Sequence, residues 1–432
     1  MQRLRQLATG ATATTIATGL ATQVAVLISG IAAARLLGPE NRGHLALIWL
    51  ITIALTQVGT LGVPVALTYA LAQAPQAVRA YARSLRATIL LQAIGLALVQ
   101  ALLLMVLFGD EPSEIALPAA ASLLVLPAMV FQFYGLAVLQ GRSRFRPFNI
   151  LRLAPSALYA GGVLVLLVGG GASLLAVTAA WIAGYVLSAA ATGYAVWSEI
   201  RDEGANDPAK ESVGDLTAFG LKGMLGSFSP TETLRADQAI VGVVLSPTAL
   251  GLYTTALAFT NLPRLIAQSV GLVVYPRAAA SKDPLAALRL VWRFVALATA
   301  VTLVIVVILE AATPWLIELL FGAEFLPAVD ATRILLIGTV FLAARRVLGD
   351  GIRGLGHPEA STYAELVSWV LLLPALLVLA ATDSLEAVSA AVAASYLVSL
   401  VTLAVLSRRV RSRLEPPQDT AGTATEPAAP SP

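Results

Sequence analysis

The sequence contains no cysteine, which excludes disulfide bonds, thiolate catalysis and cysteine-based metal sites. Its only two histidines, His44 and His357, lie far apart at expected loop edges, so they do not indicate a metal site. Motifs of soluble enzymes and of cofactor-binding proteins are missing, and no basic block is interleaved with aromatic residues. We therefore expect neither catalysis, nor a metal or other cofactor, nor a nucleic-acid partner.

Charged residues are also scarce. They make up 12% of the 432 residues, about half of the roughly 25% that is usual in soluble domains. Hydrophobic residues make up 58%, and the mean hydropathy is +0.81. A soluble chain of this size would need far more polar surface, and a lipid environment removes that need. The composition therefore predicts an all-α membrane protein.

The hydrophobic residues are grouped into runs that are long enough to cross a bilayer, which takes about 20 mainly apolar residues. The first run exceeds the apolar core of about 7–15 residues found in signal peptides, so we interpret it as an uncleaved span. Together the runs predict about 12 transmembrane helices. They cover residues 8–34, 45–67, 85–108, 115–139, 148–168, 174–197, 216–245, 250–275, 288–309, 331–348, 363–380 and 385–406.

Charges alternate between the loops that join these runs. Arg and Lys concentrate on cytoplasmic loops of membrane proteins. One set of alternate loops is basic, and both termini belong to it, whereas the other set is acidic or uncharged apart from Arg35 and Arg42. The basic set includes Arg79, Arg83, Arg86, Arg142, Arg144, Arg146, Arg277, Arg289, Arg293, Arg408 and Arg409. The pattern predicts that both termini are cytoplasmic.

A polar loop at 198–214 divides the chain into a lobe at 1–197 and a lobe at 215–413, each with six spans. The tail at 414–432 is rich in Pro, Ala and Thr and is predicted to be disordered. The motif Leu-x-Pro-x-x-x-Gly occurs at 37–43 and again at 245–251, an offset of 208 residues at equivalent places in the two lobes. Because each lobe has an even number of spans, we expect a pseudo-two-fold axis along the membrane normal, with the solute path between the lobes.

Charged residues inside spans are the candidate site residues, because they are costly in lipid and usually face a cavity or a partner. Arg264 lies near the middle of the eighth span, and Asn261 and Gln268 share its helix face. Pro263 removes a backbone hydrogen bond beside them. We expect this face to line a cavity. The alternative is that Arg264 pairs with Asp237 or Glu310 and only holds the second lobe together.

The seventh span carries Glu232, Arg235 and Asp237. Glu232 and Arg235 are three residues apart and can pair on one helix face, which favours a structural or coupling role. At the end of the first span, Arg35 can meet an anionic headgroup or simply lie at the membrane interface. Because a cationic side chain that faces a cavity can bind an anionic solute, the predicted substrate-binding residues are Arg264, Asn261, Gln268, Arg235 and Arg35. Asp237 and Glu232 are predicted to be coupling or structural charges.

These residues resemble the bacterial polysaccharide-biosynthesis flippases of the O-antigen and teichuronic-acid type. The resemblance rests on the segment 33–43, on Leu-Gly-Val-Pro-Val-Ala-Leu at 61–67, and on Asp237 followed by Gly242. It continues with Gly-Leu-Tyr-Thr-Thr-Ala at 251–256 and with Pro276, and covers about 8–413. The superfamily also includes multidrug extruders and lipid II flippases.

The resemblance implies two six-helix lobes around a V-shaped cavity and alternating access. It also implies that the solute is a polyprenyl-pyrophosphate-linked oligosaccharide, handled in the bacterial cytoplasmic membrane together with membrane lipids and glycan-assembly proteins. Coupling to H⁺ or Na⁺ is left open. An arginine presents a planar fork of donors that suits a pyrophosphate.

Two alternatives stay open. A cation-coupled multidrug extruder of the same superfamily would be expected to use a carboxylate within the membrane, and the first lobe has none inside a span. A polytopic glycosyltransferase or polymerase would be expected to carry a long outer loop with catalytic residues, whereas the outer loops of this sequence are short.

Overall fold

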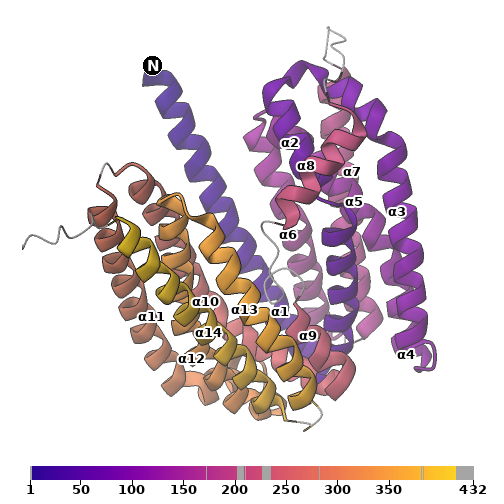
Figure 1. Ribbon diagram of the computed structural model, residues 1–432. Coiled ribbons are helices and arrows are strands. Elements are labelled where there is room, and N and C mark those ends of the chain that lie inside the picture. Colours follow the sequence, from indigo (N-terminus) through magenta and orange to yellow (C-terminus); the bar gives the residue numbers. More distant parts are fainter. Residues whose placement is uncertain are drawn as a thin grey trace, which may run out of the picture. The chain divides into compact units, whose positions relative to one another are not determined.

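The computed structural model describes residues 2–171, 173–201, 209, 211–225, 235–281, 283–380, 382 and 384–414 (Figure 1). Every regular element within these residues is a helix. Ten of the described helices are long and apolar enough to cross a membrane. The predicted all-α membrane fold is therefore confirmed.

The helices of the two halves follow one another along the chain with short connections. Those of the first half are α1 (Gln2–Gly59), α2 (Val63–Gln73), α3 (Val78–Phe108), α4 (Ser113–Ala121), α5 (Val125–Gly141), α6 (Phe145–Gly169) and α7 (Leu174–Arg201). Those of the second half are α8 (Val213–Leu225), α9 (Ala236–Ile240), α10 (Pro247–Ala279), α11 (Pro284–Leu320), α12 (Val329–Gly354), α13 (Pro358–Ala380) and α14 (Leu385–Leu414).

The backbone is unusual at three points in or between the predicted spans. Gly38 has a non-helical conformation, with φ 69 and ψ 176, so α1 consists of two helices that meet there, between the first two predicted spans. Leu61 and Gly62 both have positive φ, which ends α1 and starts α2 inside the predicted second span. Within the predicted seventh span, α8 ends at Leu225 and α9 begins at Ala236, directly after Arg235, which has a left-handed conformation with φ 49; residues 226–234 lie outside the described residues. These points explain why ten long helices correspond to about twelve spans.

The chain packs into two compact units. Unit 1 comprises Met1–Asn261, Val307–Ile337 and Leu371–Ala393, and unit 2 comprises Leu262–Val306, Gly338–Val370 and Ala394–Pro432. Each of the helices α10 to α14 contributes to both units. The predicted division into residues 1–197 and 215–413 follows the sequence repeat instead, and it stays a prediction. Residues 202–208 and 210 of the predicted inter-lobe loop, and the tail beyond 414, lie outside the described residues.

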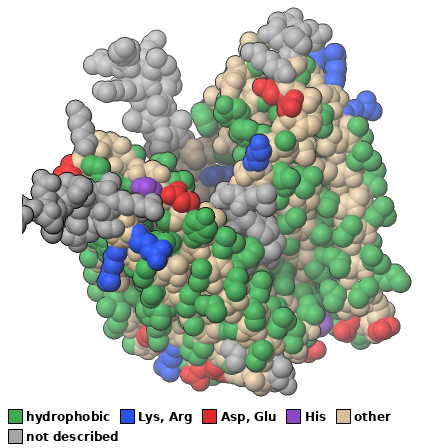
Figure 2. Space-filling view, in the orientation of Figure 1, with side chains coloured by type: hydrophobic (Ala, Val, Ile, Leu, Met, Phe, Trp, Pro, Cys, Tyr) green, Lys and Arg blue, Asp and Glu red, His purple; other side chains and the backbone are tan. Residues whose placement is uncertain are grey.

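Each unit has its own apolar core. In unit 1, Tyr81, Leu71 and Leu126 from α3, α2 and α5 are almost fully buried. In unit 2, Val274, Val291 and Val347 from α10, α11 and α12 are fully buried. Many large hydrophobic side chains are nevertheless exposed, among them Val106, Val168 and Val370, and hydrophobic side chains are spread over much of the visible face in Figure 2. Such a surface matches a lipid environment.

Close glycine contacts support the predicted repeat. In unit 1, Gly141 at the end of α5 packs against the Thr68 carbonyl of α2, which an added Cβ would approach to 2.9 Å. In unit 2, Gly354 at the end of α12 packs in the same way against the Tyr275 carbonyl of α10, at 2.5 Å. Thr68 and Tyr275 lie at nearly the offset found between the two Leu-x-Pro-x-x-x-Gly motifs. The two lobes therefore use the same backbone approach at corresponding places.

Candidate functional site

Arg264, the strongest candidate from the sequence, lies on α10 in unit 2. Its Nη2 donates a hydrogen bond of 2.8 Å to the hydroxyl of Tyr396, a buried residue of α14. Helix α10 is continuous through Pro263 and Pro276, so neither proline interrupts it. The structure thus links the Arg264 guanidinium to a neutral hydroxyl, which helps to orient the cation.

A second arginine of unit 2, Arg345, contacts α14 one turn beyond Tyr396. Arg345 of α12 forms an ion pair with Glu365 of α13, and its Nη1 donates a 3.5 Å hydrogen bond to Ser399 of α14. The side chains of Arg345 and Glu365 are 15% and 18% exposed, so the pair is mostly shielded. Both residues lie close to an end of a predicted span, 331–348 for Arg345 and 363–380 for Glu365, and the sequence analysis did not identify the pair. Only the packing of α12 on α13 brings them together.

Tyr396 and Ser399 are three residues apart on α14 and share one face. The two arginines are therefore anchored to the same helix, one through each of these hydroxyls. This polar network joins α10, α12, α13 and α14 inside unit 2. It can hold two cations in fixed positions within an apolar bundle.

The other predicted members of the α10 face behave differently. Asn261 and Gln268 are exposed, whereas Thr260, the residue before Asn261, is 2% exposed and its hydroxyl donates to the Leu257 carbonyl at 2.7 Å. Their substrate role stays a prediction. Asn261 and Gln268 lie on α10 together with Arg264, as their spacings of three and four residues from Arg264 predicted.

Of the charges in the predicted seventh span, Arg235 and Asp237 lie within the described residues. Asp237 is 3% exposed at the start of α9, and it accepts a 2.8 Å hydrogen bond from the hydroxyl of Tyr253 on α10. Arg235 precedes α9 in its left-handed conformation, so the expectation that it lies within a continuous helix was wrong. Glu232 lies outside the described residues. The proposed Glu232–Arg235 pair stays a prediction.

Glu310, the other acidic partner considered for Arg264, pairs in unit 1 with Arg333 at 3.8 Å. Arg35 is likewise engaged in unit 1. Its Nε donates a 2.8 Å hydrogen bond to the Leu320 carbonyl, and its Nη2 donates to the Leu319 carbonyl. Both carbonyls belong to the C-terminal end of α11, where a cation is favoured by the helix dipole. The geometry favours a capping role for Arg35 over contact with a headgroup.

Unit 1 contains a further cationic site that the sequence analysis missed. The Nη1 of Arg42 is shielded from solvent and makes no hydrogen bond with the described residues. The guanidinium lies within electrostatic range of Tyr159 on α6. The Tyr159 ring packs 5.1 Å from Trp49, and Trp49 packs 5.2 Å from Trp181 on α7. We call these four residues the arginine–aromatic cluster.

Two features extend this cluster. Tyr185 lies one turn from Trp181 on α7, with the two rings 6.2 Å apart, and it is within electrostatic range of Arg235. The hydroxyl of Tyr159 and the Nε1 of Trp49 are also shielded without a hydrogen-bond partner among the described residues. Arg42 and Trp49 lie seven residues apart, hence on one helix face, and this spacing was the available signal. We had counted Arg42 only as a loop charge.

The described residues hold no group of three or more His, Asp or Glu side chains able to bind a metal ion. The arginine–aromatic cluster of unit 1 presents guanidinium, hydroxyl and indole donors. Such donors bind anions and sugar hydroxyls.

The fold is that of a multi-pass membrane transporter. The structure of an inward-facing multidrug resistance MATE transporter of the MOP superfamily is similar, with a TM-score of 0.72 and 16% identity over 91% of this chain and 95% of that one. A MOP superfamily transporter from Pyrococcus furiosus gives a TM-score of 0.62 and 16% identity, over 93% of this chain and 94% of that one. At these identities the likeness shows the fold alone.

Residues 32–330 match the family described as "Polysaccharide biosynthesis protein", and the chain belongs to this family. A Shigella flexneri protein assigned to O-antigen transport is 24% identical over 269 residues, which is 61% of this chain. The match covers 64% of that protein's length. The resemblance inferred from the sequence is confirmed at the level of the family.

Proposed function

We propose that this protein carries a lipid-linked oligosaccharide, a precursor of a surface polysaccharide, across the bacterial cytoplasmic membrane by alternating access. The observation that carries the proposal is Arg42. The Nη1 of Arg42 is shielded from solvent, and a guanidinium donor that loses water without gaining a partner carries a desolvation cost. No acidic partner of Arg42 is found among the described residues, so an anionic ligand is the natural source of compensation.

The chemistry around Arg42 suits the headgroup of such a ligand. A pyrophosphate accepts several hydrogen bonds from a guanidinium fork, and the shielded Nη1 offers a donor that no described residue uses. The aromatic faces of Trp49, Trp181 and Tyr159 offer flat apolar surfaces with polar edges. Sugar rings present C–H groups to such faces and hydroxyls to the edges. The polyprenyl tail would stay in the bilayer.

Unit 2 contributes two further cations, Arg264 and Arg345, which contact Tyr396, Ser399 and Glu365. In this proposal Arg264, with Asn261 and Gln268, contacts the solute at another stage of the cycle. Arg345 and Glu365 preserve the packing of α12 on α13. In this proposal both termini lie in the cytoplasm, as the basic loops predict, and the coupling ion, H⁺ or Na⁺, is left open.

The test is complementation of a strain that lacks this gene. Wild-type protein restores the surface glycan and clears lipid-linked oligosaccharide from the membrane. Arg42→Ala is expected to leave the intermediate accumulated at unchanged protein level, with Arg42→Lys partly active because it keeps the charge but loses the planar fork. Arg146→Gln, at an exposed arginine of α6, is the matched control. Normal glycan export by Arg42→Ala would overturn the proposal.

A cation-coupled multidrug extruder is the second candidate, supported by the similarity of the fold to MATE transporters and by the buried carboxylate Asp237. The same strains, loaded with a fluorescent cationic drug, separate the two functions. An extruder would lower drug accumulation and lose this activity in Asp237→Asn. A flippase would leave drug accumulation unchanged in every variant.

A further inference from the structure

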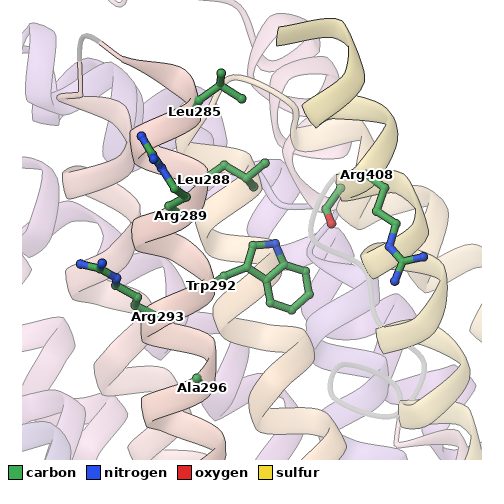
Figure 3. Close-up of a pocket in the computed structure, with 8 residues that line it drawn as sticks. Leu285, Leu288, Arg289, Trp292, Arg293, Ala296 and Arg408 are labelled. Atoms are coloured by element: carbon green, nitrogen blue, oxygen red, sulfur yellow. The ribbon is translucent and has the colours of Figure 1, made fainter. Parts of the chain in front are cut away.

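A basic cavity of about 740 Å³ lies between α11 and α14 in unit 2 (Figure 3). Its size falls within the range of about 300–1,000 Å³ that is typical of small-molecule sites. Leu285, Leu288 and Trp292 form an apolar part of its lining, and Arg289, Arg293 and Arg408 supply three cations. This cavity shares no residue with the polar network of unit 2.

The cavity lies near the start of α11 and near the end of α14. Helix α11 begins at Pro284, and Arg408 lies six residues before the end of α14 at Leu414. In Figure 3 the Trp292 indole projects from α11 toward α14, whereas Arg289 and Arg293 extend from the other side of α11. Tryptophan favours the level of the lipid headgroups, and arginine reaches the same level from a helix end.

The charge of the cavity is not neutralised within the protein. Asp283 is 3.9 Å from Arg289, and both side chains are largely exposed, which leaves this contact weak. Arg293 and Arg408 have no acidic partner in the part of the chain that the structure describes. Two to three positive charges therefore surround an apolar lining.

The surface beside the cavity is apolar. Leu297, Val301 and Val304 follow Arg293 on α11 with spacings of four, four and three residues, and they are 55%, 40% and 60% exposed. These spacings place the three side chains in one strip along the helix. A bound molecule with a charged end at the arginines would find an apolar track for a long chain. A free phosphate would gain nothing from that track.

We propose that this cavity binds one anionic phospholipid of the surrounding bilayer, with its phosphate drawn to the positive charge that Arg289, Arg293 and Arg408 give the rim of the cavity. The glycerol backbone lies against Trp292, and an acyl chain follows the Leu297–Val304 strip. Basic pockets at the ends of transmembrane helices bind anionic headgroups by this combination of charge and apolar surface. The bound lipid is a resident of the protein surface and is independent of the solute that the protein moves.

The test uses the purified full chain in mild detergent. Native mass spectrometry measures retained phosphatidylglycerol against phosphatidylcholine at equal concentration. The wild type is expected to retain phosphatidylglycerol preferentially. The variant Arg289→Gln/Arg293→Gln/Arg408→Gln is expected to lose that preference, by roughly fivefold for each arginine removed. The control Arg83→Gln/Arg86→Gln/Arg146→Gln removes the same charge from exposed arginines of α3 and α6 and keeps the preference.

Three other outcomes would each overturn the proposal. Equal loss in the two triple variants would mean diffuse surface attraction, and equal retention of both lipids by the wild type would mean that no anion site exists. Displacement of phosphatidylglycerol by millimolar inorganic phosphate would assign the cavity to a soluble phosphate. Arg408→Gln alone, measured in the same way, gives the roughly fivefold loss even if the triple variant fails to fold.

Discussion

Gly43 and Gly251 occupy corresponding positions in the two Leu-x-Pro-x-x-x-Gly motifs, and each packs against the proline of the other motif. A Cβ added to Gly43 would lie 1.6 Å from the Pro247 carbonyl oxygen, and one added to Gly251 would lie 1.9 Å from the Pro39 carbonyl oxygen. The contact is reciprocal, as expected where a pseudo-two-fold axis passes between two repeats. Both motifs lie in unit 1, so the repeat provides a structural joint between the starts of the two lobes.

Gly43→Ala is expected to destabilise the protein by about 1–3 kcal/mol, because the methyl group would meet rigid backbone. Gly251→Ala is expected to cost a similar amount, since its surroundings mirror those of Gly43. Thermal unfolding of the purified variants, followed by fluorescence, measures both. Gly161→Ala in α6 is the control, because nothing lies within 4 Å of its added Cβ. A wild-type transition in Gly43→Ala would show that the reciprocal contact is absent.

Arg264→Ala is expected to lower glycan export about tenfold or more while membrane insertion stays intact, since a hydrogen bond to a charged group contributes about 1.5–3 kcal/mol. Tyr396→Phe removes only the hydroxyl that orients Arg264, so it should give a smaller loss. Export and protein level are compared in the complemented deletion strain. Full export by Arg264→Ala would leave this residue with a structural role, as would a fall in stability that accounts for all of the lost export.

Glu365→Leu is expected to destabilise the protein by about 2–4 kcal/mol, because it leaves the mostly shielded Arg345 cation without its partner. The double variant Arg345→Met/Glu365→Leu should recover most of this loss, since no charge then remains unpaired. Chemical or thermal unfolding of both variants checks the difference. Arg353→Gln is the control: it breaks the exposed 3.5 Å contact with Asp350 and should cost under about 1 kcal/mol. An additive double variant would contradict the pairing.

Arg35→Gln is expected to destabilise the protein by about 1 kcal/mol, because the end of α11 loses the cation that caps its last carbonyls. Export should fall no further than the loss of folded protein explains. Arg35→Lys should keep part of the stability, since the charge remains. The opposite result, in which export is lost and the unfolding transition is unchanged, would restore the predicted contact between Arg35 and an anionic headgroup.

Sequence alone was sufficient for the properties that depend on local composition. Hydropathy identified lipid as the solvent, since each apolar run is judged by its own residues. Ends of most spans were predicted within a few residues, as for 148–168 against α6 and 174–197 against α7. The motifs at 37–43 and 245–251 predicted a repeat, which the reciprocal glycine contact supports.

The tertiary structure decided which polar groups meet. Arg345 and Glu365 are 20 residues apart, and Arg42 and Tyr159 are 117 apart, so no local pattern links either pair. Arg35 was predicted to bind an anionic group, but in the structure its guanidinium donates to the last carbonyls of α11. Such partnerships depend on which helices pack together, and many packings satisfy the same apolar runs. The sequence therefore determined where the chain crosses the bilayer, and only the packed helices determined which of its cations are already occupied.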